Sequence, residues 1–86
     1  RKDLKYKIEY YFNGELKEEK NETIENQTYN QKVTEYEDKV EVGYKLEKTE
    51  NLPLIISENE ENNVIKVFYI TDDAQTKVLK YIYSLF

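Results

Sequence analysis

The sequence contains no cysteine, histidine, methionine or tryptophan, and only two glycines and one proline among its 86 residues. The lack of cysteine excludes disulfide bonds and thiolate metal sites. The lack of histidine removes the commonest general base and metal ligand of enzymes. No glycine-rich loop is present either. These gaps predict a protein that is not an enzyme, with no catalytic residues, no metal-binding residues and no cofactor.

Long apolar runs and a surplus of positive charge are missing as well. The sequence holds 18 acidic and 13 basic residues, for a net charge of −5. Nucleic acids and anionic membrane surfaces attract clustered lysine and arginine, whereas here the basic residues are scattered. We therefore expect no nucleic-acid partner and no membrane insertion by this segment. Because the first residue is Arg1 rather than methionine, the chain is interpreted as a piece of a longer protein.

The stretch around which the chain is organised is Leu4–Gly14 (LKYKIEYYFNG), a strand running into a tight turn. Apolar or aromatic residues recur at every second position, which is typical of a half-buried β-strand. This apolar face consists of Leu4, Tyr6, Ile8, Tyr10 and Phe12. The opposite face carries Lys5, Lys7 and Glu9.

The Asn13-Gly14 pair supplies the positive φ angles that a hairpin turn needs. A two-residue loop would place Leu16 opposite Tyr11 on the polar face. We favour a three-residue loop with a glycine bulge, which places Leu16 opposite Tyr10 on the apolar face. The charged run Lys17–Glu22 then suits the exposed part of an edge strand.

One short helix is predicted in the middle of the chain, over residues 35–41. Thr34 and Glu37 fit a capping box, and Gly43 can end the helix. Three apolar side chains share a helical face at spacings of three and four: Val33, Tyr36 and Val40.

The second half of the chain predicts further strands. Residues 44–48 alternate, and Pro53 makes residues 52–56 an edge strand or the start of one. After the acidic loop Ser57–Asn63, the window Val64–Ile70 is almost continuously apolar and fits a central strand covered on both faces. The resulting order is that of an α+β, ubiquitin-like β-grasp, a mixed sheet with one short helix and with its first and last strands adjacent and parallel.

The end of the chain repeats its beginning. Leu79–Tyr83 (LKYIY) echoes Leu4–Ile8 (LKYKI), so residues 1–73 form one module. Residues 74–86 are interpreted as a linker and the severed start of a following repeat. This tail also carries a helical stripe, which leaves its conformation open.

Three segments resemble the mucin-binding (MucBP-type) repeats of Gram-positive surface proteins: Tyr6–Tyr11 followed by Gly14, Gly43–Leu46 and Asn63–Tyr69. The resemblance covers residues 5–70. The chain departs from the family at Tyr29–Gln31, where a glycine usually precedes the helical segment.

This resemblance implies a secreted, extracellular β-grasp module on a cell-wall-anchored protein. It implies a non-catalytic repeat of an adhesin that spaces or weakly binds host glycoprotein or mucin glycans, with neighbouring repeats as partners. The alternative is a β-grasp protein-interaction domain that docks a partner by strand addition at an exposed edge.

No ligand-binding residue can be named from the sequence. The nine tyrosines could stack on sugars, but tyrosine also simply favours pleated surfaces. Tyr11, which lies off the apolar face, is the best candidate for exposure.

Three other patterns have simple explanations. The acidic loop 58–63 lacks the central glycine of a calcium loop and is interpreted as solvated charge. Glycosylation patterns at Asn21 and Asn26 are expected by chance in an Asn-rich bacterial sequence. A Lys–Asn isopeptide bond to Asn63 would need a buried lysine, and Lys5 and Lys7 point away from the apolar face.

Overall fold

The computed structural model describes residues 1–74, which form a small, β-rich mixed sheet. The expected repeat start lies outside the described residues, apart from Ala74. The strands are β1 (Leu4–Phe12), β2 (Glu15–Leu16), β3 (Glu22–Gln27), β4 (Lys32–Val33), β5 (Tyr44–Glu50), β6 (Leu54–Ile55) and β7 (Val64–Thr71). The two 3-10 turns are η1 (Glu18–Lys20) and η2 (Glu60–Asn62).

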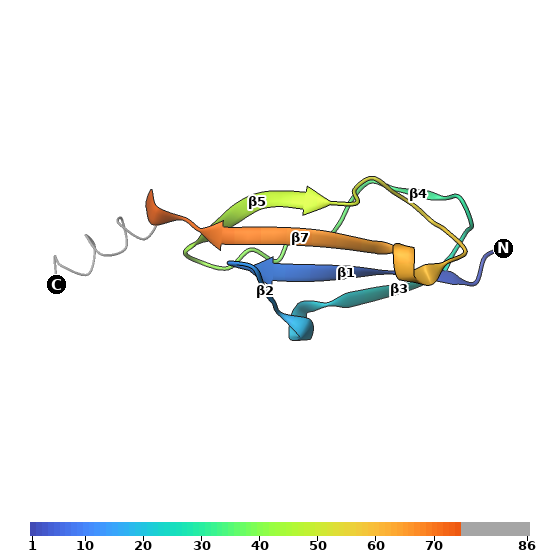
Figure 1. Cartoon of the computed structure of the whole chain (residues 1–86), viewed down its shortest axis with the longest axis horizontal. Coiled ribbons are helices and arrows are strands. Elements are labelled where there is room, and N and C mark those ends of the chain that lie inside the picture. The colour runs from blue at the N-terminus through green and yellow to red at the C-terminus, as the bar shows by residue number, and fades with distance from the viewer. Residues whose placement is uncertain (75–86) are drawn as a thin grey trace, which may run out of the picture.

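The main sheet is built around β1 (Figure 1). β7 lies parallel to β1, and β5 pairs antiparallel with the far side of β7. β2 and β3 pair with the other side of β1, near its end and its beginning respectively. This arrangement confirms the prediction that the first and last strands of the module are adjacent and parallel. β4 and β6 form a separate pair, in which β6 is the short edge strand expected after Pro53.

The hydrophobic core lies on one face of this sheet. The buried side chains of β1 and β7 alternate along each strand, as the period of two in β1 predicts. In β7, Ile65, Val67 and Tyr69 are fully buried, whereas the residues between them are only half-buried. The expectation that β7 is covered on both faces was therefore wrong. Within residues 1–74, the second face of the sheet is open, and it is called the open face below.

The predicted helix over residues 35–41 is not formed. Residues 34–42, which we call the covering segment, contain no helix, although Tyr36 packs against the core as expected. Val40 is 44% exposed. The physical reason lies in the sheet beneath, because the Tyr10 hydroxyl donates to the Glu37 carbonyl and the Tyr69 hydroxyl accepts from the backbone N–H of Lys39. These two backbone groups bond to tyrosines instead of to the backbone groups four residues away that a helix would give them.

The hairpin after β1 also differs from the prediction. Leu16 pairs with Tyr11 and not with Tyr10, so the loop has two residues and Leu16 lies on the open face. Asn13 and Gly14 have φ angles of 51° and 80°, the two positive values of the turn type that matches strand twist. Further on, η1 interrupts the segment that we expected to continue as an edge strand.

Asparagine accounts for the sharp turns. All positive-φ residues other than glycine within residues 1–74 are asparagines, namely Asn13, Asn26, Asn30 and Asn51. Asparagine tolerates this conformation better than other L-residues. Two of these side chains also make long-range bonds, Asn13 to Thr71 and Asn51 to the Asn62 and Val64 carbonyls. The Asn-rich composition therefore supports the fold.

Candidate functional site

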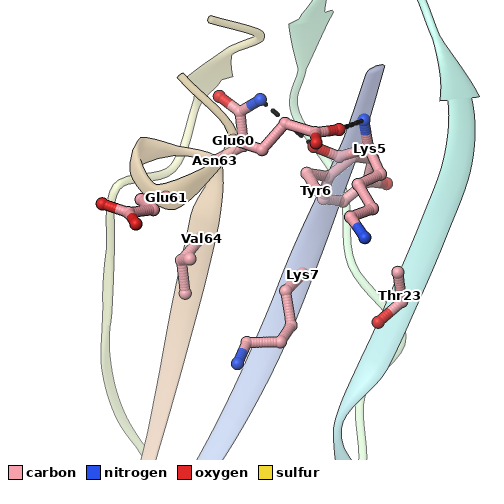
Figure 2. Close-up of a pocket in the computed structure, with 8 residues that line it drawn as sticks. All are labelled: Lys5, Tyr6, Lys7, Thr23, Glu60, Glu61, Asn63 and Val64. Atoms are coloured by element: carbon pink, nitrogen blue, oxygen red, sulfur yellow. Dashed lines mark hydrogen bonds between the residues drawn. The ribbon is translucent and has the colours of Figure 1, made fainter. Parts of the chain in front are cut away.

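A pocket opens where β7 begins, between η2 on one side and β3 on the other (Figure 2). Its lining combines ammonium, carboxylate and hydroxyl groups over a small apolar patch. The lining residues are Lys5, Tyr6, Lys7, Thr23, Glu60, Glu61, Asn63 and Val64. Such a lining can hold a polar ligand through hydrogen bonds and ion pairs, but these eight residues offer no activated nucleophile.

Asn63 forms the back wall of this pocket and is fully buried. Its amide group donates to the carbonyls of Lys5 and Ser57, and its side-chain oxygen accepts from the backbone N–H of Ser57 at 2.8 Å. Glu60 closes the same corner by accepting from the backbone N–H of Lys5 at 2.7 Å. Both polar ends of the Asn63 side chain thus bond to backbone groups. The Asn63 side chain ties β1 to the segment before η2.

The lysines near Asn63 are directed to solvent. Lys5 is exposed, and Lys7 Nζ lies 3.3 Å from a carboxylate oxygen of Glu9. A crosslink to Asn63 would need a lysine amine buried beside the amide carbon. The geometry therefore agrees with our interpretation against an isopeptide bond.

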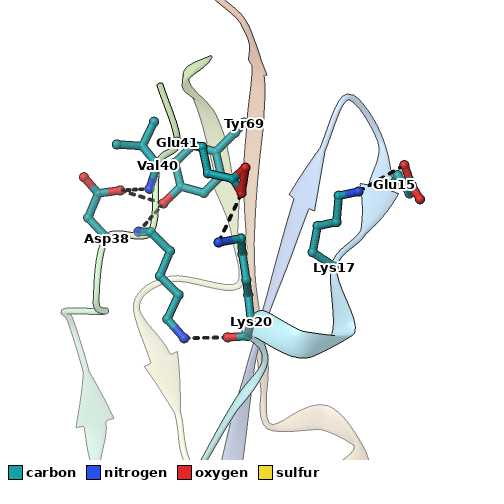
Figure 3. A network of polar contacts seen from close by, with 8 residues as sticks. Glu15, Lys17, Lys20, Asp38, Val40, Glu41 and Tyr69 are labelled. Atoms are coloured by element: carbon teal, nitrogen blue, oxygen red, sulfur yellow. Dashed lines mark hydrogen bonds and ion pairs between the residues drawn. The ribbon is translucent and has the colours of Figure 1, made fainter. Parts of the chain in front are cut away.

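A second polar site fastens the covering segment over the core (Figure 3). The Tyr69 hydroxyl donates to Asp38 Oδ1 at 2.6 Å, and the same carboxylate oxygen accepts from the backbone N–H of Val40. From η1, the Lys20 carbonyl accepts from Lys39 Nζ, and Lys20 Nζ pairs with a Glu41 carboxylate oxygen at 3.1 Å. The two lysines also lie over aromatic rings, Lys39 over Tyr10 and Lys20 over Phe12.

Ionisation in this network follows from these contacts. Burial, together with the negative charge of Glu22, raises the pKa of Tyr10. Burial, together with the hydrogen bond to Asp38, raises the pKa of Tyr69. The Tyr69 hydroxyl and the Val40 N–H lower the pKa of Asp38. Both hydroxyls therefore stay protonated and act as hydrogen-bond donors, which is a structural role.

The neighbouring carboxyl group behaves in the opposite way. A hydrogen bond to Glu22 and the negative charge of that group raise the pKa of Glu37. Glu22 is also paired with Lys39 at 3.5 Å. The pKa values of two adjacent carboxyl groups of the covering segment, Glu37 and Asp38, are thus shifted in opposite directions. The partners that cause the shifts, Glu22 and Tyr69, lie on different strands.

The open face of the sheet carries a row of side chains across four strands. The registers place Leu16 of β2 beside Tyr11 of β1, Tyr11 beside Phe68 of β7, and Phe68 beside Lys48 of β5. The Tyr11 and Phe68 rings stack with centroids 4.8 Å apart, and Lys48 Nζ lies 4.9 Å from the centre of the Phe68 ring.

The contacts of Tyr11 favour the structural interpretation of this residue. Its ring is half-buried, one ring face stacks on Phe68, and Lys66 Nζ lies 5.9 Å from the ring centre. Its hydroxyl donates to Glu9 at 3.1 Å. The aromatic residues of the row therefore stabilise the open face. Tyr29, which the sequence did not single out, is 51% exposed.

The other candidates from the sequence are the acidic loop and the two glycosylation patterns. In the acidic loop, the Asn59 side chain caps η2 by accepting from the Glu61 N–H. Within residues 1–74, no group of three or more acidic side chains is arranged to hold a metal ion. Asn26 is exposed at a positive-φ position, and the Asn21 side-chain oxygen is buried. No helix in the described part of the chain is long and apolar enough to cross a membrane.

Comparison with known proteins does not identify the chain. No family model, curated protein or solved structure matches it. The likeness to mucin-binding repeats therefore depends on the three motifs named above and stays a prediction.

Proposed function

We propose that this chain is a non-catalytic repeat module of a bacterial cell-surface adhesin, with a β-grasp-like fold, that spaces or weakly binds host glycoprotein. The observation that carries the proposal is the parallel pairing of β1 with β7, in register from Lys7 with Val64 to Phe12 with Tyr69. The chain enters the sheet at one end and leaves β7 at the opposite end (Figure 1). Modules linked in this way follow one another along a line.

The length of the central strand sets the spacing that each module adds. β1 has nine residues and therefore spans about 30 Å at roughly 3.3 Å per residue. The buried tyrosine hydroxyls, Asn63 and the turn asparagines all serve this rigid frame. A rigid rod with its connections at the two ends suits a stalk that holds a binding surface away from a cell wall.

Small-angle X-ray scattering on the 86-residue sequence, alone and as two copies in tandem, tests the spacing role. We expect the maximum dimension to grow by at least about 30 Å in the two-copy protein, with an unchanged cross-section. Binding to immobilised mucin, before and after enzymatic removal of its glycans, tests the adhesive role. Glycan-dependent binding or linear extension supports the proposal. Two copies lying side by side, without mucin binding, would overturn it.

A second candidate is a protein-interaction domain that docks a partner by strand addition. It is favoured by the open edge of β5, which pairs with β7 alone within the described sheet. A partner added there would satisfy the outward backbone groups of Tyr44–Glu50. The expected sign is slowed amide hydrogen exchange in residues 44–50 on binding. Protection elsewhere in the sheet would contradict this candidate.

A further inference from the structure

The free edge of β5 carries a regular pattern of charge. Its sequence from Lys45 to Glu50 is KLEKTE, in which basic and acidic residues alternate in sign. The strand is almost wholly exposed, including Leu46 at 48%. Within the described part of the chain, this edge has no strand partner. Charged residues on such an edge usually prevent association, but charges of alternating sign can also complement those of a second strand.

We propose that β5 pairs antiparallel with β5 of a second copy of this chain, in the single register in which Lys45 lies opposite Glu50. In that register, Glu47 also lies opposite Lys48, and Leu46 lies opposite Thr49. Two-fold symmetry repeats each contact, so every charged side chain from Lys45 to Glu50 lies opposite a side chain of the opposite charge. Opposite charges on facing positions stabilise strand pairs.

A bulge in β5 makes this register possible. The pairing of β5 with β7 shifts between Leu46 and Lys48, which leaves Glu47 as the extra residue. Lys45 lies beside Ile70 and Glu50 beside Lys66, so both project from the open face although they are five positions apart. Without the extra residue they would lie on opposite faces.

Neighbouring registers place like charges together. A shift of one residue sets Glu47 against Glu47 in one direction and Lys48 against Lys48 in the other. A further shift sets Lys45 against Lys48, or Glu47 against Glu50. Like charges directly opposite each other are destabilising, and an odd shift also turns the side chains to the wrong faces. The charge pattern therefore favours this register over the four registers nearest to it.

The inference rests on the strand-addition candidate and is independent of the adhesin role. It is tested by sedimentation velocity at low salt on the full chain and on two variants, Lys45→Glu and Glu50→Lys. The wild-type chain is expected to dimerise as its concentration rises. Each single variant sets like charges opposite each other twice in the dimer and should dimerise at least about tenfold more weakly.

The decisive sample is the mixture of the two variants. The carboxylate introduced at position 45 of one chain then faces the ammonium group introduced at position 50 of the other, and the heterodimer regains every opposite-charge contact. Lys2→Glu, which makes the same charge change in the exposed segment before β1, is the matched control and should dimerise like the wild type. Circular dichroism confirms that each variant is folded. A wild-type chain that stays monomeric, or variants that self-associate as strongly as the wild type, would overturn the proposal.

Cysteine crosslinking tests the register, because the natural sequence contains no cysteine. A mixture of Leu46→Cys and Thr49→Cys should form a disulfide-linked heterodimer on oxidation. Each variant alone should not, because its two cysteines would lie about three residues apart along the strands, beyond disulfide reach. Disulfide-linked homodimers of either variant, with no linked heterodimer in the mixture, would show a different register and contradict the proposal. Neither result bears on glycan-dependent binding to mucin, which tests the adhesin role separately.

Discussion

Tyr10 and Tyr11 are neighbours in β1 with the same side chain, yet they lie on opposite faces of the sheet and act differently. Tyr10 is fully buried on the covered face, and its hydroxyl holds the Glu37 carbonyl of the covering segment. Tyr11 lies on the open face, where its ring stacks on Phe68 and its hydroxyl donates to Glu9. Tyr10 therefore holds the covering segment against the sheet, whereas Tyr11 packs against Phe68 on the face that no segment covers among the described residues.

This contrast shows how a small sheet can be stabilised with no α-helix on either face among residues 1–72. On the covered face, ring burial supplies apolar contact while the hydroxyls satisfy backbone groups of an extended segment. On the open face, a cross-strand row of Leu16, Tyr11, Phe68 and Lys48 shields the strands from water. Tyrosine suits both tasks because its ring is apolar and its tip is polar.

The largest expected effect separates the two faces directly. Tyr10→Ala removes a fully buried ring and should lower the free energy of unfolding by about 3–5 kcal/mol. Tyr11→Ala removes a half-buried ring, whose pairing with Phe68 adds about 0.5–1.5 kcal/mol to its partial burial, and should cost less than Tyr10→Ala. Urea denaturation of both variants measures the difference. Equal losses would mean that the open face is covered after all.

A smaller effect isolates the hydroxyl groups. Tyr69→Phe keeps the ring but leaves the Lys39 N–H and the Asp38 carboxylate without this partner, so we expect a loss of about 1–3 kcal/mol. Tyr11→Phe is the matched control and should change stability little, because the Glu9 carboxylate keeps its pairing with Lys7. Chemical denaturation gives both values. If Tyr69→Phe is as mild as its control, apolar burial alone holds the covering segment.

The parts of the fold set by local pattern were predictable from the sequence. The period of two in β1 and the apolar run of β7 predicted two adjacent parallel strands, which the structure contains. The helix over residues 35–41 was predicted wrongly because its capping pattern and apolar spacing are local, whereas the bonds that replace it come from Tyr10 and Tyr69. Nothing near those tyrosines in the sequence indicates their distant partners.

Which side chains lie beside Tyr11 and along β5 depends on the register in which the strands pair. Leu16 was placed opposite Tyr10 on the argument that an apolar residue belongs on the apolar face. In the structure, Leu16 instead lies on the open face, where it is the cross-strand neighbour of Tyr11. The β5 bulge at Glu47 likewise has no signal in the sequence, since no glycine or proline marks it. One residue of register decides which side chains meet, and periodicity does not fix it.

The smallest expected effect concerns pH and the two adjacent carboxyl groups of the covering segment. The pKa of Asp38 is lowered in the folded state from an ordinary value of 3.8, so its contribution is present above that pH and lost as the pH falls. The pKa of Glu37 is raised from an ordinary value of 4.5, so its contribution is present in acid and lost as the pH rises through the raised value.

Urea denaturation at several pH values between acidic and neutral measures how the free energy of unfolding changes with pH, and the two carboxyl groups should change it in opposite directions. Wild type should exceed Asp38→Asn in stability at neutral pH, and the gap should narrow below pH 3.8. Glu37→Gln should be at least as stable as wild type at neutral pH, because a neutral amide beside Glu22 removes the repulsion, and the two should converge in acid. Glu35→Gln, an exposed neighbour with the same charge change, controls for net charge. If the stability difference from wild type changes with pH in the same direction for both variants, then net charge, and not the contacts to Tyr69 and Glu22, sets the pH dependence of stability.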